Sequence, residues 1–167
     1  MAHIKYGILD GKVYTSVEMP VAASQYFYHG GINLVYLDSS GHVTLALTAT
    51  ATLYGFANVP AGSGAGTSTA YWLSSATAGA DKISVYPFAL NPNLLLLLPA
   101  DATVTAAMRG NACDIIAVND GTATTIDVGT STTDVMLIHG LGTDYKANAV
   151  ATDVVVSVNP AKLQADT

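Results

Sequence analysis

INLVYLDSSGHVTLAL, residues 32–47, is the stretch that decides the fold class of this 167-residue chain. On both sides of its centre, apolar side chains recur at alternate positions, the period of a strand with one buried face. The centre, Asp38-Ser39-Ser40-Gly41, has the composition of a turn. The stretch therefore predicts a β-hairpin formed by Ile32–Leu37 and His42–Leu47.

The same pattern of short strands and turns extends along the rest of the chain. Val, Thr, Tyr and Ile, which suit a pleated and half-buried surface, dominate these segments. Asp10-Gly11 and Asn119-Asp120-Gly121 are hairpin signals, and the continuous leucine run at 94–98 should be buried on both faces. Further strands are expected at Ile4–Leu9, Lys12–Ser16, Tyr26–Tyr28, Leu53–Val59, Thr69–Ser74, Lys82–Phe88, Asn93–Leu98, Cys113–Val118, Thr124–Val128, Asp134–Leu141 and Asp153–Val158.

One segment, Ala102–Arg109, has the features of a short helix. Asp101 is its candidate N-cap, and Gly110 stands just past its end. The predicted fold class is therefore all-β, with small β-barrel or β-sandwich lobes and at most one short helix.

The composition changes abruptly at Ala61–Ser68, where no side chain is large enough to pack in a core. Such a stretch is typical of a loop or linker. It predicts an N-terminal β lobe at residues 1–61, a linker at 62–68 and a C-terminal β lobe at 69–167.

Charge and composition exclude several classes of function. The chain has 6 Lys+Arg against 12 Asp+Glu, and 50% of its residues are hydrophobic but only 11% are charged. Six scattered basic residues cannot form a nucleic-acid-binding face, and Leu94–Leu98 is far shorter than the roughly 20 residues that span a bilayer. Neither nucleic acid nor membrane is an expected partner. Few charges with many apolar residues favour a surface covered by neighbouring subunits.

The single cysteine, Cys113, cannot form an internal disulfide, so folding in a reducing compartment is expected. The first residues also show no secretory signal pattern.

Two strings resemble catalytic motifs but lack the partners that catalysis needs. Val135–Gly142 reads VMLIHGLG, similar to an oxyanion-hole strand of α/β-hydrolases, yet no nucleophile elbow and no histidine follow it. Ile126–Val135 reads IDVGTSTTDV, similar to a phosphate loop of actin-like ATPases, yet it lies near the end of a short chain. Strands and turns explain both strings, so neither enzymatic activity nor a cofactor is predicted.

The potential metal ligands are dispersed along the sequence. The four histidines show no i, i+4 pairing and Cys113 stands alone, so the spacing predicts no zinc site. The aspartates lie mostly in predicted turns, for example Asp38, Asp101 and Asp120. A Ca²⁺ site built from loop carboxylates remains open as an alternative.

Two clusters of consecutive aromatic residues, Tyr26-Phe27-Tyr28 and Tyr71-Trp72, supply most of the candidate contact residues. Consecutive strand residues point to opposite faces, so each cluster should bury part of its rings and leave the others at the surface. Tyrosine and tryptophan anchor interfaces at low entropic cost. With the N-terminal segment added, the predicted contact residues are Ile4, Tyr6, Tyr26, Phe27, Tyr28, Tyr71 and Trp72.

Several turns and glycines in Val21–Val59 follow an order that belongs to a known family. They are Ser24-Gln25-Tyr26-Phe27, Gly30-Gly31, Leu34–Leu37, Asp38-Ser39-Ser40-Gly41-His42-Val43 and Tyr54-Gly55-Phe56-Ala57. This segment resembles the opening lobe of the capsid decoration (cement) proteins of tailed phages. The chain departs from the simplest members in its long Gly/Ala loop and its larger second lobe.

Later parts of the chain resemble uncharacterised virion proteins of environmental phages. These parts are Ala70–Ala80, Pro99–Ile116, Val128–Val135 and Asn159-Pro160-Ala161-Lys162.

The resemblance implies a structural role rather than an enzymatic one. Proteins of this family bind the outer surface of a phage head and clamp neighbouring major capsid subunits, commonly as trimers. It therefore implies the major capsid protein as partner, a homo-oligomer with a trimer favoured, folding in the host cytoplasm, and a place on the outer capsid surface. An acidic, lysine-poor chain suits the outside of a shell, away from packaged DNA.

A carbohydrate- or cell-surface-binding β module of a phage fibre or adhesin is the alternative. In such a module, exposed aromatic rings would stack on sugars and turn aspartates would hold Ca²⁺.

Overall fold

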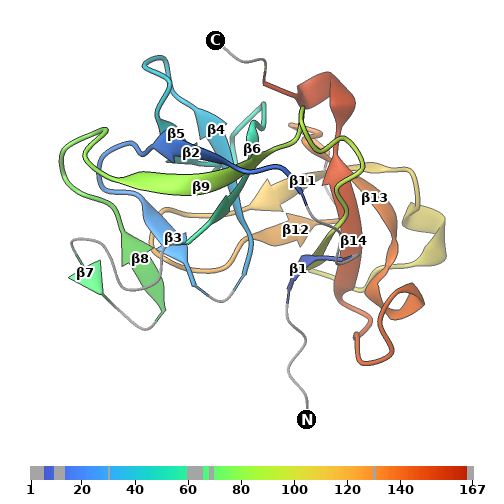
Figure 1. The fold of residues 1–167 in the computed structure, drawn as a ribbon. Helices are drawn as coiled ribbons and strands as arrows, with labels where there is room; N and C mark the ends of the chain where they lie inside the picture. Colours follow the sequence, from blue (N-terminus) through green and yellow to red (C-terminus); the bar gives the residue numbers. More distant parts are fainter. Residues whose placement is uncertain are drawn as a thin grey trace.

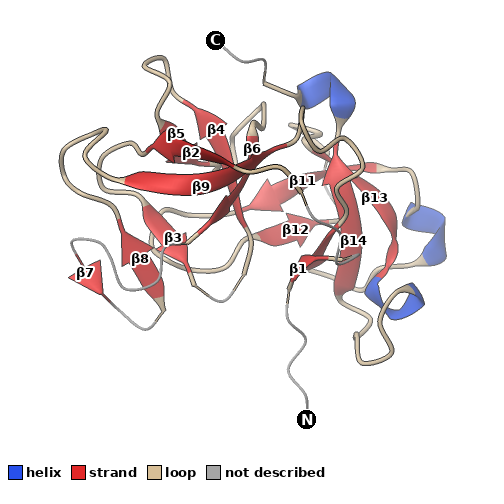
Figure 2. Ribbon diagram, in the orientation of Figure 1, coloured by secondary structure: helices blue, strands red, loops and turns tan. Residues whose placement is uncertain are grey.

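The computed structural model describes residues 6–9, 14–29, 31–59, 66–67, 70–129 and 131–164. Within these ranges the chain is all-β, as predicted (Figure 1, Figure 2). The strands are β1 (Gly7–Ile8), β2 (Val17–Pro20), β3 (Tyr26–Tyr28), β4 (Asn33–Leu37), β5 (Val43–Leu45), β6 (Gly55–Asn58), β7 (Gly66–Thr67), β8 (Tyr71–Leu73), β9 (Lys82–Pro87), β10 (Leu96–Pro99), β11 (Ala112–Ile116), β12 (Thr125–Asp127), β13 (Met136–Leu141) and β14 (Asp153–Val158). The helical residues of the described ranges form the short 3-10 segments η1 (Ala106–Met108), η2 (Gly142–Asp144) and η3 (Pro160–Lys162).

Sheet 1 has five strands in the order β2-β9-β6-β4-β5. Every neighbouring pair in it is antiparallel. The two ends of the sheet meet, because Val21, directly after β2, forms a parallel bridge with Val43 on β5. Sheet 1 is therefore curled into a barrel-like wall.

Sheet 2 has six strands in the order β1-β10-β14-β13-β11-β12, and it curls in the same way. Ala100, just past β10, forms a parallel bridge with Ile126 on β12, and the Asp101 N–H donates to the Ile126 carbonyl at 2.9 Å. The third sheet, sheet 3, is small and has the order β3-β8-β7. In Figure 1, sheets 1 and 3 occupy one side of the molecule and sheet 2 the other.

The two curled sheets share part of one hydrophobic core. β4 is buried on both faces: Leu34 packs in a cluster with Leu96 and Ile115 of sheet 2, whereas the next residue, Val35, packs inside sheet 1 with Val85. Neighbouring strand residues point to opposite faces, so β4 is a wall between the two interiors. The two halves of the molecule are thus joined by packing and not merely by a connecting segment.

The hairpin predicted at residues 32–47 is confirmed. β4 and β5 pair antiparallel, and the Asp38 N–H donates to the His42 carbonyl at 3.0 Å across the turn. Gly41 has a φ of +77° there, in the left-handed region that glycine occupies without steric cost.

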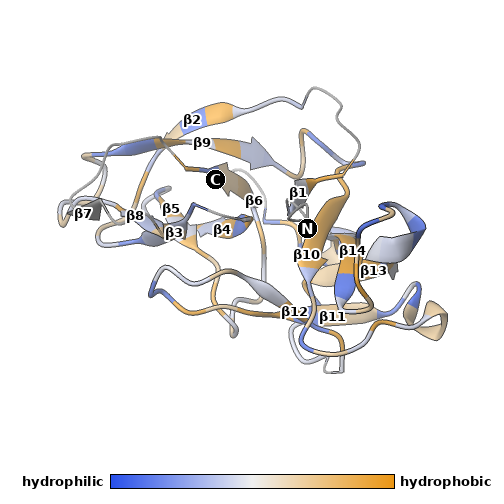
Figure 3. Cartoon of the chain, turned by 90° about the horizontal axis from the view of Figure 1, so that it is seen from below, coloured by the Kyte–Doolittle hydropathy of each residue, from blue (hydrophilic) through white to orange (hydrophobic). Residues whose placement is uncertain are grey.

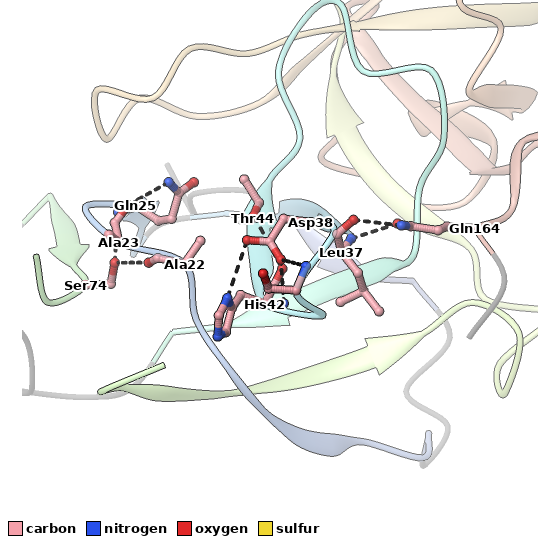
Figure 4. A network of polar contacts seen from close by, with 10 residues as sticks. Ala22, Ala23, Gln25, Leu37, Asp38, His42, Thr44, Ser74 and Gln164 are labelled. Atoms are coloured by element: carbon pink, nitrogen blue, oxygen red, sulfur yellow. Dashed lines mark hydrogen bonds and ion pairs between the residues drawn. The ribbon is translucent and has the colours of Figure 1, made fainter. Parts of the chain in front are cut away.

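The Asp38 side chain locks this turn (Figure 4). One carboxylate oxygen accepts the N–H groups of Ser40 and His42, both at 2.9 Å, and the other lies 3.5 Å from the His42 imidazole. Burial acts to raise the pKa of Asp38, but these donors and the imidazole outweigh burial and lower it. The turn is therefore held by its own side chains.

The lobe boundary predicted at residues 62–68 is wrong. β9, from beyond that segment, lies in the middle of sheet 1 between β2 and β6, and β1 belongs to sheet 2. Within 62–68, Gly66–Thr67 pairs with β8, and the remaining residues lie outside the described ranges. The chain instead passes between sheets 1 and 2 twice, from β1 to β2 and at residues 88–95 from β9 to β10. Strand pairing across long sequence separations therefore decides which strands share a sheet.

The turn predicted at Asp10-Gly11 lies outside the described residues. β1 pairs with β10, and the next strand, β2, pairs with β9. The leucine run is buried as predicted at four of its five positions: Leu94, Leu96, Leu97 and Leu98 are at most 1% exposed, whereas Leu95 is half-buried. Figure 3 shows β10 as a hydrophobic strand beside β14.

The helix predicted at Ala102–Arg109 shrinks to the single 3-10 turn η1. Its candidate cap acts elsewhere, because the Asp101 carboxylate accepts the Val128 N–H at 3.0 Å. The Val104 side chain is buried, and the Val104 backbone N–H donates to the Ala151 carbonyl. Tertiary hydrogen bonds thus replace the helical ones. No helix in the described ranges is long and apolar enough to cross a membrane.

Side-chain amides occupy backbone positions that sheet 1 leaves open (Figure 4). Gln164 accepts the Leu37 N–H and donates to the Leu37 carbonyl, both at 2.7 Å. Gln25 accepts the Leu45 N–H at 3.0 Å. These contacts supply the hydrogen bonds that a further strand would otherwise make.

Candidate contact surface

The aromatic residues of sheet 3 divide between its two faces. β3 and β8 pair antiparallel, with Phe27 opposite Trp72 and Tyr28 opposite Tyr71. The Tyr26, Tyr28 and Tyr71 side chains are half-buried on one face. The strand alternation expected from the sequence is therefore present.

Two of the predicted contact residues are wrong, because Phe27 and Trp72 lie in the core. Phe27 is 0% and Trp72 2% exposed, and their ring centroids are 5.5 Å apart. They pack with Val35 and Val85 inside sheet 1. Their large apolar rings fill that interior, so neither can touch a partner in the folded chain.

The three tyrosines of sheet 3 rest on glycines and on one another. The rings of Tyr26 and Tyr71 are 5.1 Å apart and tilted by 60°. A Cβ atom at Gly121 would come within 2.5 Å of the Tyr71 ring, and one at Gly31 within 3.3 Å of the Tyr28 ring. The glycines let the rings lie close to the backbone, so these tyrosines are held in fixed positions.

The loop between β11 and β12 joins this tyrosine face to sheet 1. Asn119 accepts the Tyr26 N–H at 2.8 Å and donates to the Ser24 carbonyl at 3.1 Å. Two residues earlier, the Ala117 carbonyl accepts the Thr48 N–H at 3.2 Å, and the Thr48 hydroxyl lies 3.0 Å from this carbonyl and 3.1 Å from the Ala117 N–H. One loop thus contacts two segments that are far apart from it in sequence, residues 24–26 and Thr48.

Exposed aliphatic side chains surround these contacts. Leu47, Ile116 and Val118 are 37%, 38% and 51% exposed, while the residue between the last two, Ala117, is buried. None of the three is predicted from the sequence, although the alternation of Ile116 and Val118 just before the Asn-Asp-Gly turn indicates exposed side chains.

We call Leu47, Ile116, Val118, Tyr26 and Tyr71 the charge-poor surface. The segments around these residues, 24–28, 47–52, 70–74 and 116–122, contain one Asp, Glu, Lys or Arg between them, Asp120. Contiguous apolar surface with little charge is typical of a site that another macromolecule covers.

Tyr6, a candidate from the N-terminal segment, does not belong to this surface. The Tyr6 hydroxyl donates to Asp153 at 2.9 Å, and Asp153 is 0% exposed. Burial, the hydrogen bond to Asp153 and its negative charge together raise the pKa of Tyr6 to about 12. Tyr6 is therefore an internal anchor, and Ile4 lies outside the described residues.

In Ile126–Val135, the string similar to a phosphate loop, backbone amides donate hydrogen bonds to the carboxylate of Asp114. Asp114 accepts the N–H groups of Thr132, Thr133 and Asp134 at 2.7–2.9 Å. Burial acts to raise the pKa of Asp114, but these donors outweigh it and lower the pKa. Asp114 thus occupies three amides of this string, and the Gly129 N–H donates to Asp127 at 3.1 Å.

In Val135–Gly142, the string similar to a hydrolase strand, His139 lies on β13 and is exposed. Its Nε2 lies 2.8 Å from the Ser157 Oγ. Within the described ranges, no three His, Cys, Asp or Glu side chains lie close enough together to hold a metal ion.

Cys113 is buried, and its thiol should be unreactive in the folded chain. Burial, together with the negative charges of Asp114, Asp127 and Asp134, raises its pKa to about 12. We expect a thiol reagent at pH 8 to label the native protein only as fast as it unfolds, and the urea-unfolded chain at once. Rapid stoichiometric labelling of the native chain would contradict this burial.

Comparison of the chain with protein-family models, with curated proteins and with solved structures finds no match.

Proposed function

We propose that this chain is a structural virion protein that decorates the outer surface of a phage head. In this role it binds major capsid subunits through the charge-poor surface and stabilises the contacts between them. A ligand that binds the assembled lattice but not free subunits favours the lattice by mass action. The proposed role needs no catalysis and no cofactor.

The observation that carries the proposal is the charge-poor surface on a rigid all-β frame. Three exposed aliphatic residues and two half-buried tyrosines surround a loop that is hydrogen-bonded to Ser24, Tyr26 and Thr48. A surface fixed in this way loses little entropy when a partner covers it. The resemblance of Val21–Val59 to decoration proteins points to the capsid as that partner.

The tyrosine geometry favours a protein partner over a sugar. The Tyr26 and Tyr71 rings are tilted by 60°, so together they form no flat platform on which a sugar ring could stack. Gly121 also packs against the Tyr71 ring. Rigid tyrosines with aliphatic neighbours are typical of protein interfaces.

Val118→Asp is the substitution that tests the surface. A carboxylate at this position would lose its hydration in the contact, so we expect about tenfold weaker binding to empty shells assembled from the major capsid protein of the same virion. Co-sedimentation with the shells measures the binding, and light scattering of the free chain measures its oligomeric state, with a trimer expected.

Val150→Asp is the matched control, because Val150 is 55% exposed but lies outside the charge-poor surface, in the connection before β14. It should leave shell binding unchanged. Equal loss in both variants would refute the charge-poor surface. A strict monomer that does not sediment with shells, but binds a glycan on an array or melts higher with Ca²⁺, would favour a fibre or adhesin module.

A further inference from the structure

The described N-terminal residues, 6–9, contain β1 and belong to a different sheet from the next strand, β2. Gly7 and Ile8 pair with Leu97 and Leu96 of sheet 2, while β2 lies in sheet 1. Before β2, Thr15 is held by two backbone hydrogen bonds to the Asn91 side chain, both at 2.9 Å. We refer to residues 6–9 as the arm.

Sheet 2 closes without the arm. Its ring runs from β10 through β14, β13 and β11 to β12, and the bridge between Ala100 and Ile126 joins the two ends. The arm lies further along the same edge of β10, at residues 95–97, where the Leu9 N–H donates to the Leu95 carbonyl at 3.0 Å. It therefore fills the part of the wall that β12 does not reach.

The slot that receives the arm fits its sequence at two side chains. The Tyr6 hydroxyl donates to one oxygen of the wholly buried Asp153, whose other oxygen accepts the Val150 N–H at 2.8 Å. Ile8 packs against the core cluster that contains Leu96. Without the arm, one oxygen of the buried Asp153 carboxylate would have no hydrogen-bond donor, and Leu96 and Leu97 would become more exposed. Both effects are unfavourable, so binding of this segment in the slot is favoured.

We propose that this slot is a strand-acceptor site for the arm of a second copy of the chain. A second copy offers the identical residues, so its arm makes in trans every contact that the arm makes in cis. The two arrangements then differ only in the connecting segment and in the cost of association, which makes exchange depend on concentration. This inference goes beyond the proposed function and does not depend on it.

The first test measures the mass of the full chain by chromatography with light scattering, from low micromolar to millimolar concentration. We expect an exchanged oligomer that increases with concentration and is absent from a variant lacking residues 1–9. An excess of a synthetic peptide of residues 1–9 should dissociate it, and a scrambled peptide should not. Unchanged monomer at every concentration, or equal oligomer in the shortened variant, overturns the proposal.

The second test is a cross-link between Ile8→Cys and Leu96→Cys. The Leu9–Leu95 hydrogen bond makes the neighbouring Ile8–Leu96 pair a non-hydrogen-bonded one, in which the Cα atoms are close enough for a disulfide. Oxidation at high concentration should give a covalent dimer absent from either single variant. Cross-links found exclusively within one chain overturn the proposal. If this core pair does not fold, judged by Trp72 fluorescence, the light-scattering test decides alone.

Discussion

Trp72→Ala is expected to lower the free energy of unfolding by about 3–5 kcal/mol, the range for truncating a buried large aromatic ring. Trp72 is 2% exposed and packs against Phe27 in the interior of sheet 1, so the truncation leaves a cavity between sheets 1 and 3. Urea denaturation followed by circular dichroism measures the loss.

Two further variants show whether this loss comes from core packing. Trp72→Phe should cost less than Trp72→Ala, because it keeps an aromatic ring and removes the Nε1 donor, which is buried without a hydrogen-bond partner among the described residues. Tyr28→Ala, on the half-buried face of the same sheet, should cost about 1 kcal/mol. Equal losses for Trp72→Ala and Tyr28→Ala would mean that sheet 3 does not share the core of sheet 1.

Asp114→Ala is the second large effect, with an expected loss of about 3 kcal/mol at pH 7. Asp114 is 6% exposed, and its carboxylate accepts three backbone N–H groups from residues 132–134. Without it, these donors lose their partner, and the segment that leads into β13 loses its support. Urea denaturation at neutral pH gives the size of the loss.

The pH dependence of this variant separates the charge from the shape of the side chain. The pKa of Asp114 lies below the ordinary aspartate value of 3.8 in the folded chain. Its stabilisation is therefore fully present above that value and is lost as the pH falls through the lower, folded pKa. Wild type and Asp114→Ala should converge in stability in strong acid and diverge towards neutral pH.

Asp120→Ala is the control for Asp114→Ala. The Thr122 hydroxyl and N–H lower the pKa of Asp120 as well, but this carboxylate is exposed and supports only its own turn. It should therefore change stability little. A difference between wild type and Asp114→Ala that stays constant from neutral pH to strong acid would show that the carboxylate charge does not stabilise this loop.

Local patterns predicted most strands and two of the hairpins. The hairpin at 32–47 forms as expected, and so does the pairing of β11 with β12 across Asn119-Asp120-Gly121. Four of the five leucines at 94–98 are buried, in or next to β10 of sheet 2. Side-chain periodicity and turn preference are properties of a few consecutive residues, so they can be read without knowing the rest of the fold.

The candidate site was predicted only in part. The alternation of side chains along a strand predicts that neighbouring rings lie on opposite faces of the sheet, but it does not predict which face is buried. Phe27 and Trp72 are core residues, whereas Tyr26 and Tyr71 remain partly exposed. The aliphatic part of the charge-poor surface depends on contacts such as that between Thr48 and Ala117, 69 residues apart in sequence.

The sequence by itself determined the all-β class, the scarcity of charge, the main turns and the burial of the leucine run. Tertiary structure alone decided which strands share a sheet: it placed β9 in sheet 1, β1 in sheet 2 and the boundary after β9. The physical reason is that a strand can satisfy its backbone hydrogen bonds with any suitably patterned partner. The choice among partners depends on how the whole set of side chains fills the two interiors, which no single segment encodes.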